Sequence, residues 1–393
     1  MDLRSKLAHL QAPAGQGAGA GHGSGILRPH VHPAESLLPF FERDTALGCV
    51  SWRSELLKPS HHVGRIPTSA AHAADPALLA LLALDPKLAS LDPRTALYLD
   101  TETTGLGGSG ALAFLIGMAW FDGDQLRLEQ VLLRSPADER AGLELVAERI
   151  EQASFLVTYN GKSFDLPLLA SRRVMTRAPA LAVRPHLDLL HVARRLHRTR
   201  LGACRLTLLE SEVLGFERGP DVQGADIPAR YSHFLRTGDE AALTDVVEHN
   251  ALDVVSMAAL VGLYGEPLTS LHEQDLVSLA RTYHRAGDAQ RTDEALEYAL
   301  ERGAGRPAIR ARGEIAKARG ERAQALVDFE SLAADLDDSS ARLELAKLYE
   351  HFAKEPLKAL KLALIGTAET TEAQSRRVSR LSRKVARANQ TSK

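Results

Sequence analysis

The chain has 393 residues, with 48 Lys and Arg against 50 Asp and Glu and a formal net charge of -2. This balance excludes a protein that binds nucleic acid through a global excess of positive charge, so a polyanion would have to bind a local patch. The two cysteines, Cys49 and Cys204, exclude a thiolate zinc framework and favour a reducing compartment. The length predicts two or more domains.

The N-terminal part is predicted to lead into the first core strand. Residues 1–32 are expected to form a flexible segment, because the tract 11–25 is rich in Gly and Ala and cannot bury enough apolar surface to order itself. Residues 33–94 are expected to form a preface packed on the next domain, with a helix over 74–91. The sequence has no run of 18 apolar residues and no signal-peptide core, which predicts no transmembrane segment and a cytoplasmic protein.

Residues 95–265 alternate between strand and helix patterns. The expected strands are 96–99, 111–121, 126–134 and 153–160, and the expected helices include 136–152 and 248–264. The second and third strands should form a hairpin around the turn Asp-Gly-Asp-Gln. Three strands in succession, then a helix, a strand and further helices, predict an α/β layer with a mixed sheet.

The C-terminal part has a different pattern. From residue 271 the strand signals end and a period of about 33 residues is present, with 279–288, 312–321 and 345–355 in register. Small and aromatic residues at these spacings resemble tetratricopeptide repeats over 271–365, and a plain helical bundle is the alternative. A basic tail, 366–393, would bind nucleic acid, a partner protein or an anionic membrane surface.

Two carboxylates follow the apolar strand 96–99 directly. In a strand, residues i and i+2 point to the same face, so Asp100 and Glu102 should project side by side, roughly 7 Å apart along the backbone. The Gly-rich stretch after them cannot continue a strand, which places both acids at the rim of the sheet. Two like charges this close predict a bound cation.

Two further acids stand in apolar surroundings. Asp165 follows the strand 153–160, and Asp253 lies on the apolar helix 248–264, four residues after His249 on the same helix face. Acids in such positions are costly to bury unless they are paired or bind a metal. Their placement therefore indicates a function.

The four acids carry a family resemblance. Asp100 and Glu102 in DTETTGL, Asp165 in NGKSFDLP and Asp253 in HNALD resemble the four acids of the DEDD exonucleases, in the same order. The long interval before the last acid is similar to that in the proofreading-type exonuclease domain of the ribonuclease H-like fold. A nuclease domain followed by tetratricopeptide-like repeats resembles the bacterial YprB-like proteins. The resemblance implies a ribonuclease H-like α/β domain over 95–265 with a mixed sheet, followed by an all-α helical repeat domain.

The resemblance also implies a reaction, the 3'-to-5' hydrolysis of single-stranded DNA or RNA with two Mg²⁺ or Mn²⁺ ions. Asp100 should bridge both ions, Glu102 and Asp253 should hold the ion that activates water, and Asp165 should fix the second. These exonucleases place Tyr four residues, or His five residues, before the last Asp, whereas here His249 takes the four-residue position. His249 is nevertheless the expected general base, because a neutral imidazole accepts a proton near pH 7.

Substrate contacts are expected from a local basic segment. Nine Arg and one acid, Asp188, lie between Ser171 and Arg205, which predicts a groove that pairs with phosphates. The residues expected to contact the substrate are Thr103, Asn160, Arg172, Arg173, Arg194 and Arg195. A simple Asn-Gly turn is an equal alternative for Asn160, a solvated helix face is one for the arginines, and a structural role is favoured for Asp188.

Two other functions remain open at this point. The same acids on this fold would suit a structure-specific endonuclease. Alternatively, the protein would be a catalytically silent, nucleic-acid-binding adaptor that acts through its helical repeats. The repeats are expected to recruit a protein partner in either case, and the presence of all four acids favours catalysis.

Overall fold

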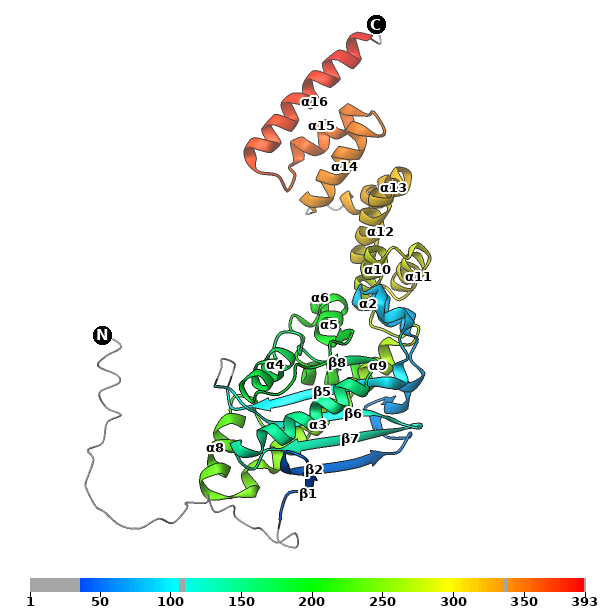
Figure 1. Ribbon diagram of the computed structural model, residues 1–393. Helices are drawn as coiled ribbons and strands as arrows, with labels where there is room; N and C mark the ends of the chain where they lie inside the picture. The colour runs from blue at the N-terminus through cyan, green and yellow to red at the C-terminus, as the bar shows by residue number, and fades with distance from the viewer. Residues whose placement is uncertain (1–35, 106–109, 335–337, 392–393) are drawn as a thin grey trace, which may run out of the picture. The chain divides into compact units, whose positions relative to one another are not determined.

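The computed structural model describes residues 36–105, 110–334 and 338–391 (Figure 1). The predicted flexible segment 1–32 lies outside these residues, as do positions 33–35 of the predicted preface and Leu106 of the DTETTGL motif.

A seven-stranded mixed sheet forms the centre of the α/β part, as predicted (Figure 1). Its strands are β1 (Phe41–Thr45), β2 (Gly48–Leu57), β5 (Ala96–Thr103), β6 (Ala113–Asp122), β7 (Gln125–Leu132), β8 (Phe155–Thr158) and β9 (His186–Asp188). Their order is β1-β2-β7-β6-β5-β8-β9, in which the first five are antiparallel to their neighbours and β8 and β9 continue parallel to β5. The short strands β3 (His62–Val63) and β4 (Ile66–Pro67) form a separate two-stranded sheet.

The segment before β5 differs from its prediction. The described part of the predicted preface does pack on the domain, since Ala71, Leu79 and Leu82 lie in its core, but β1 and β2 also extend the main sheet because β2 pairs with β7. The helix expected over 74–91 is also shorter, since α2 (Pro76–Ala83) ends at Leu84, which has the left-handed conformation with φ 56°. The side chains of Asp85 and Asp92 then cap two separate 3-10 turns, each beginning at a proline.

Helices cover both faces of the main sheet. In chain order they are η2 (Thr68–Ala73), α2, η3 (Pro86–Ser90), η4 (Pro93–Thr95), η5 (Pro136–Asp138), α3 (Glu139–Gln152), α4 (Asp165–Met175), α5 (Leu189–Leu196), α6 (Arg198–Leu201), α7 (Leu206–Leu209), η6 (Glu210–Leu214), α8 (Ile227–Thr237), η7 (Glu240–Leu243) and α9 (Thr244–Tyr264). Along β5, Ala96 and Tyr98 join the core cluster that contains most of the buried apolar residues of α9, whereas Leu97 and Leu99 join the cluster that contains α3. This division explains the uninterrupted apolar start of β5, because a strand covered on both faces needs apolar residues at every position.

Helix α9 is the central helix of the α/β part. By length and composition alone, Glu240–Tyr264 could cross a membrane, but 78% of its apolar window is buried inside the protein. The helix approaches the sheet closely at Gly117, where an added Cβ would lie 2.4 Å from the Asn250 Oδ1 atom. The apolar character of α9 is therefore explained by its position in the core.

The C-terminal region consists of paired helices. They are α10 (Glu273–Ala286), α11 (Ala289–Glu301), α12 (Gly305–Arg319), α13 (Arg322–Ala333), α14 (Ser339–His351), α15 (Pro356–Ile365) and α16 (Thr371–Thr391). Gly287 and Gly320 end α10 and α12 in the left-handed conformation, at the turn positions that the sequence period predicted. The predicted basic tail is for the most part helix α16, whose Leu381 is fully buried in the core of the last helices.

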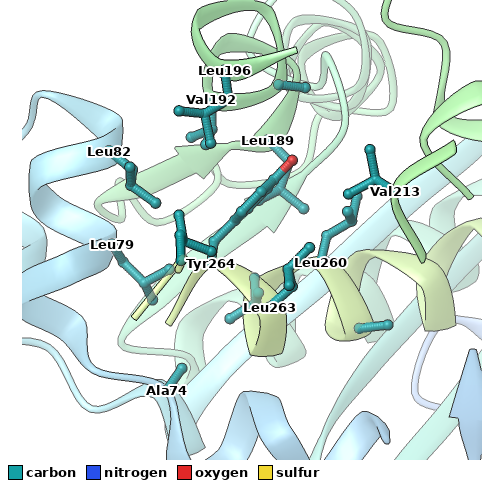
Figure 2. Packing of buried hydrophobic residues seen from close by; sticks show 14 of the residues in the cluster. Ala74, Leu79, Leu82, Leu189, Val192, Leu196, Val213, Leu260, Leu263 and Tyr264 are labelled. Carbon is teal, nitrogen blue, oxygen red and sulfur yellow. The ribbon is translucent and has the colours of Figure 1, made fainter. Parts of the chain in front are cut away.

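The first helix pair shares a core with the α/β part. Tyr264, the last residue of α9, lies among apolar side chains of α2, α5 and η6 (Figure 2). Its hydroxyl lies 3.0 Å from Nε2 of His197, and Nδ1 of His197 lies 2.9 Å from a carboxylate oxygen of Asp275 in α10. Burial raises the pKa of Asp275, but hydrogen bonds from His197 and Arg200 lower it more, so this buried carboxylate stays ionised.

Candidate functional site

Asp100 and Glu102 lie side by side at the end of β5, opposite Gly117 and Leu115 of β6. Both residues have intermediate exposure at the rim of the sheet. Burial raises the pKa of Asp100 well above its ordinary value, and the nearby acids raise it further. Burial likewise raises the pKa of Glu102 to about 7. The cluster therefore holds more negative charge than its surroundings stabilise.

Helix α9 brings Asp253 and His249 to the same rim. The Nε2 atom of His249 lies 3.8 Å from Oδ2 of Asp253 and 3.9 Å from Oε1 of Glu102. Burial lowers the pKa of His249, but Asp253, Glu102 and Asp221 together raise it more, so the pKa is raised overall. The structure thus gathers four of the five predicted catalytic residues: Asp100, Glu102, His249 and Asp253.

Asp165 is held slightly apart. It begins α4 and is buried, and its Oδ1 atom accepts a 2.5 Å hydrogen bond from the Thr101 hydroxyl. Thr101 points to the opposite face of β5 from Asp100 and Glu102. Burial raises the pKa of Asp165 to about 6, and its charge raises the pKa of both Asp100 and Glu102. Asp165 acts on the cluster through its charge.

Two buried side-chain amides, those of Asn250 and Gln130, fix the orientation of Asp100. Neither residue was predicted from the sequence. Asn250 is fully buried and donates from Nδ2 to Oδ2 of Asp100 over 2.8 Å. Gln130 of β7, also fully buried, donates from Nε2 to Oδ1 of Asn250 at 2.9 Å and to the Val247 carbonyl at 2.8 Å. These bonds fix both amide orientations. A polar residue beside His249 in an apolar helix was the available signal.

Arg218 and Asp221, in the segment after η6, were also missed. Both carboxylate oxygens of Glu210, which is fully buried, accept hydrogen bonds of 2.6 Å from Arg218. The same guanidinium donates to Oδ1 of Asp253 and lies 3.1 Å from Asp221. The pKa of Asp221 is lowered, because hydrogen bonds and charges from His249 and Arg218 outweigh its burial.

Asp221 sets the proton position on His249. Its two carboxylate oxygens lie 2.8 and 2.9 Å from Nδ1 of His249. Because the ionised carboxylate can only accept a hydrogen bond, Nδ1 carries the ring proton and donates the hydrogen bond to Asp221. Nε2 is then the ring nitrogen that faces Glu102 and Asp253. No local sequence motif links residues 221 and 249, so their contact could be found only in the folded structure.

The carboxylates of the acid cluster are suitable ligands for a divalent cation, but they are not arranged as a complete coordination shell. Among residues 36–105, 110–334 and 338–391, no three His, Cys, Asp or Glu side chains are gathered as a metal site. The contacts above explain this, because Arg218 holds Asp253, Asn250 holds Asp100 and Thr101 holds Asp165. The donors are carboxylate oxygens, which suit Mg²⁺ or Mn²⁺, and the pKa values of Asp100, Glu102 and Asp165 are raised. A cation would have to replace the guanidinium at Asp253.

Two predicted substrate residues make local backbone contacts, Thr103 at the end of β5 and Asn160 in the turn after β8. The Thr103 hydroxyl donates to the Gly105 carbonyl at 2.8 Å. Asn160 has φ +71° and donates its backbone N–H to Oδ1 of Asp188 at 2.8 Å, while Lys162 donates to Oδ2 at 3.1 Å. Asp188 therefore organises this turn, in agreement with the structural role favoured for it. A role for Thr103 and Asn160 in substrate binding stays a prediction.

The predicted basic groove is largely used inside the protein. Arg172 pairs with Glu139, and Arg173 is buried and bonds Glu144 and two backbone carbonyls. Arg195 donates to the Leu82 carbonyl at 3.0 Å, whereas Arg194 is exposed. These contacts explain Arg172, Arg173 and Arg195 as structural residues. Their predicted contacts with a substrate, like that of Arg194, stay predictions.

Comparisons with known proteins agree with the fold. Residues 97–264 match the family model described as the RNase_H superfamily, a range that includes all five predicted catalytic residues. The chain is 32% identical over 280 residues to the uncharacterized protein YprB of Bacillus subtilis (strain 168), which covers 68% of this chain and 67% of that protein. The chain belongs to the YprB family. This member of the YprB family therefore contains an RNase H-like domain, a fold that suggests nuclease activity.

Among solved structures, the chain is similar to the family B DNA polymerase from the hyperthermophilic archaeon Pyrobaculum calidifontis. The match has 18% identity and a TM-score of 0.35, and covers 54% of this chain and 29% of the polymerase chain. At that score the similarity adds nothing to what the YprB family match gives.

Proposed function

We propose that the protein is a metal-dependent nuclease, a DEDD-type 3'-to-5' exonuclease that hydrolyses single-stranded nucleic acid. The observation that supports this most is the meeting of Asp100 and Glu102 from β5 with Asp253 and His249 from α9. These groups come from two elements about 150 residues apart. The excess of negative charge at their meeting point favours a bound cation over a purely structural role.

The residues of the chain divide the work of the reaction. Asp100, Glu102 and Asp253, with Asp165 nearby, would hold two Mg²⁺ or Mn²⁺ ions, which neutralise the charge that develops on the attacking and leaving oxygens. Asn250 holds the carboxylate of Asp100 in one orientation. His249, with its Nδ1 proton bound to Asp221, presents Nε2 to accept a proton from the attacking water.

The direct test uses a single-stranded oligonucleotide of DNA or RNA labelled at its 5' end. It is incubated with wild type or Asp100→Ala in Mn²⁺, Mg²⁺ or EDTA. The proposal predicts a ladder that shortens stepwise from the 3' end, and that both EDTA and Asp100→Ala abolish it. Comparison of the two oligonucleotides gives the sugar preference.

Two outcomes would contradict the proposal. Cleavage of a circular single strand would show an endonuclease in place of the exonuclease. Oligonucleotides that are bound by wild type with metal but remain intact would show an adaptor without catalytic activity.

A further inference from the structure

A basic cavity lies among the last helices, far in sequence from the acid cluster. It has a volume of about 640 Å³ and is lined by side chains of α12, α13, α14 and α16. Its charged lining consists of one acid, Glu350, one histidine, His351, and six Lys and Arg residues: Lys317, Arg322, Lys347, Arg377, Arg380 and Lys384. In a chain with slightly more acids than bases, this is a marked local excess of positive charge.

The only acid in the lining has more cations than it can neutralise. The Glu350 side chain is fully buried and lies 2.9 Å from Arg380, 2.8 Å from Lys384 and 3.4 Å from Arg377. Hydrogen bonds from Arg380 and Lys384 outweigh its burial and lower the pKa of Glu350 to about 2. Three cations therefore converge on a single negative charge.

Two acids that pair with lining residues from outside the lining neutralise only part of the remaining positive charge. Glu369 binds Arg377 over 2.7 Å, and Glu344 binds Lys347 over 2.7 Å and also pairs with Lys317. Arg322 is exposed, and no hydrogen bond or ion pair of its side chain is found within the described residues. Six cations thus face three acids around a cavity of nucleotide dimensions.

We propose that this cavity binds the phosphates of single-stranded nucleic acid, as a second contact separate from the acid cluster. The choice of ligand rests on the proposed nuclease function. It also rests on the aromatic side chain of Phe352, which lines the cavity with 38% of its surface exposed, because single strands bind where cations meet an aromatic ring. Guanidinium and ammonium groups pair with phosphates without reading sequence.

The test measures binding without hydrolysis. Fluorescence anisotropy of a labelled single-stranded oligonucleotide is recorded in EDTA with Asp100→Ala protein, alone and combined with Arg322→Gln and Lys384→Gln. We expect binding about tenfold weaker, and a dependence of log K on log salt that is shallower by about 1.4, since each phosphate contact on a single strand contributes about 0.7.

The matched control combines Arg376→Gln and Arg383→Gln, which remove the same charge from exposed positions of α16 outside the cavity. These changes should alter the affinity less than twofold. Arg322→Gln alone keeps every contact of Glu350 and should weaken binding severalfold with an unchanged melting temperature. Equal losses in the cavity and control variants would overturn the proposal, as would oligonucleotide binding that is unchanged in the cavity variants.

This readout is independent of the nuclease proposal. If wild type degrades the oligonucleotide while the cavity variants bind it normally, the second contact alone is wrong. If no substrate is degraded but the cavity variants lose binding, the nuclease proposal alone is wrong.

Discussion

The buried side-chain amide of Asn250 fixes the orientation of the Asp100 carboxylate by donating a hydrogen bond to it. Asn250→Ala removes the bond to Oδ2 of Asp100 and leaves the Gln130 amide without one of its acceptors. We expect the free energy of unfolding to fall by about 1–3 kcal/mol. Because Asp100 would lose its fixed orientation, we also expect Mn²⁺ affinity to fall about 10–100-fold.

Urea unfolding and Mn²⁺ titration of the same samples check both expectations. Ser232→Ala, a polar-to-apolar change at an exposed residue of α8, is the control. Loss of stability without any loss of Mn²⁺ affinity would show that Asn250 stabilises the fold without positioning Asp100.

Arg218 supplies positive charge to the acid cluster when no metal is bound. Arg218→Gln leaves Glu210 buried without its cation, which should cost about 3–5 kcal/mol of unfolding free energy. Asp253 is then released, so Mn²⁺ should raise the unfolding midpoint more in the variant than in wild type.

Thermal unfolding with and without Mn²⁺ measures this difference, with Arg236→Gln at an exposed position of α8 as the control. An equal Mn²⁺ effect in wild type and Arg218→Gln would mean that the guanidinium and the metal do not compete for Asp253.

At the scale of elements, the site depends on how closely α9 approaches β6. A Cβ at Gly117 would lie 2.4 Å from Oδ1 of Asn250 and 2.9 Å from Val254. Gly117→Ala should therefore shift α9 and destabilise the protein by about 1–3 kcal/mol. It should also lower nuclease activity, because α9 carries His249 and Asp253.

Gly224→Ala is the matched control, since its added Cβ would meet no atom within 4 Å. Denaturant unfolding and initial hydrolysis rates are measured for both variants. If Gly117→Ala behaves like Gly224→Ala, the close approach of α9 to β6 is not needed.

Helix α16 is held by an ion-pair network that depends on pH. The pKa of Glu350 is about 2 in the folded protein, below the ordinary 4.5 of a glutamate. A depressed pKa contributes stability above about pH 4.5, and this contribution is lost as the pH falls toward 2. Glu350→Gln should therefore destabilise the C-terminal helices by about 2–3 kcal/mol at pH 7.

Urea unfolding followed by helical circular dichroism at pH 7, 4 and 3 tests this dependence. The difference in unfolding free energy between wild type and Glu350→Gln should be smaller at pH 4 than at pH 7, and smaller again at pH 3. A difference that is the same at pH 7 and pH 3 would mean that the ionised form of Glu350 does not hold α16.

Across the whole molecule, the sequence predicted those helices and strands that a local residue pattern determines. Alternation and apolar runs predicted the hairpin β6–β7 and the core helix α9, and the 33-residue period predicted the helix pairs. Spacing along a strand and a helix predicted that Asp100 would lie beside Glu102 and His249 beside Asp253. The strands β1 and β2 were missed, because the pairing of β2 with β7, which brings both strands into the main sheet, is a long-range contact with no local signal.

The same limit applies within the site. Arg218 and Asp221 lie in a Gly- and Pro-containing segment with no periodic pattern, and only folding brings them to Asp253 and His249. The arginines 172, 173 and 195 illustrate the same limit, since a charge excess along the chain does not show which side chains have internal partners, and their contact with a substrate stays a prediction.

The central claim is that the acids of β5 and α9 form a divalent-cation site, and Mn²⁺ binding measured by electron paramagnetic resonance tests it most directly. Wild type should bind two Mn²⁺ ions per chain, and Asp100→Asn, with unchanged circular dichroism, should bind them at least tenfold more weakly. Equal binding by wild type and Asp100→Asn, or no binding by folded wild type, would contradict the claim.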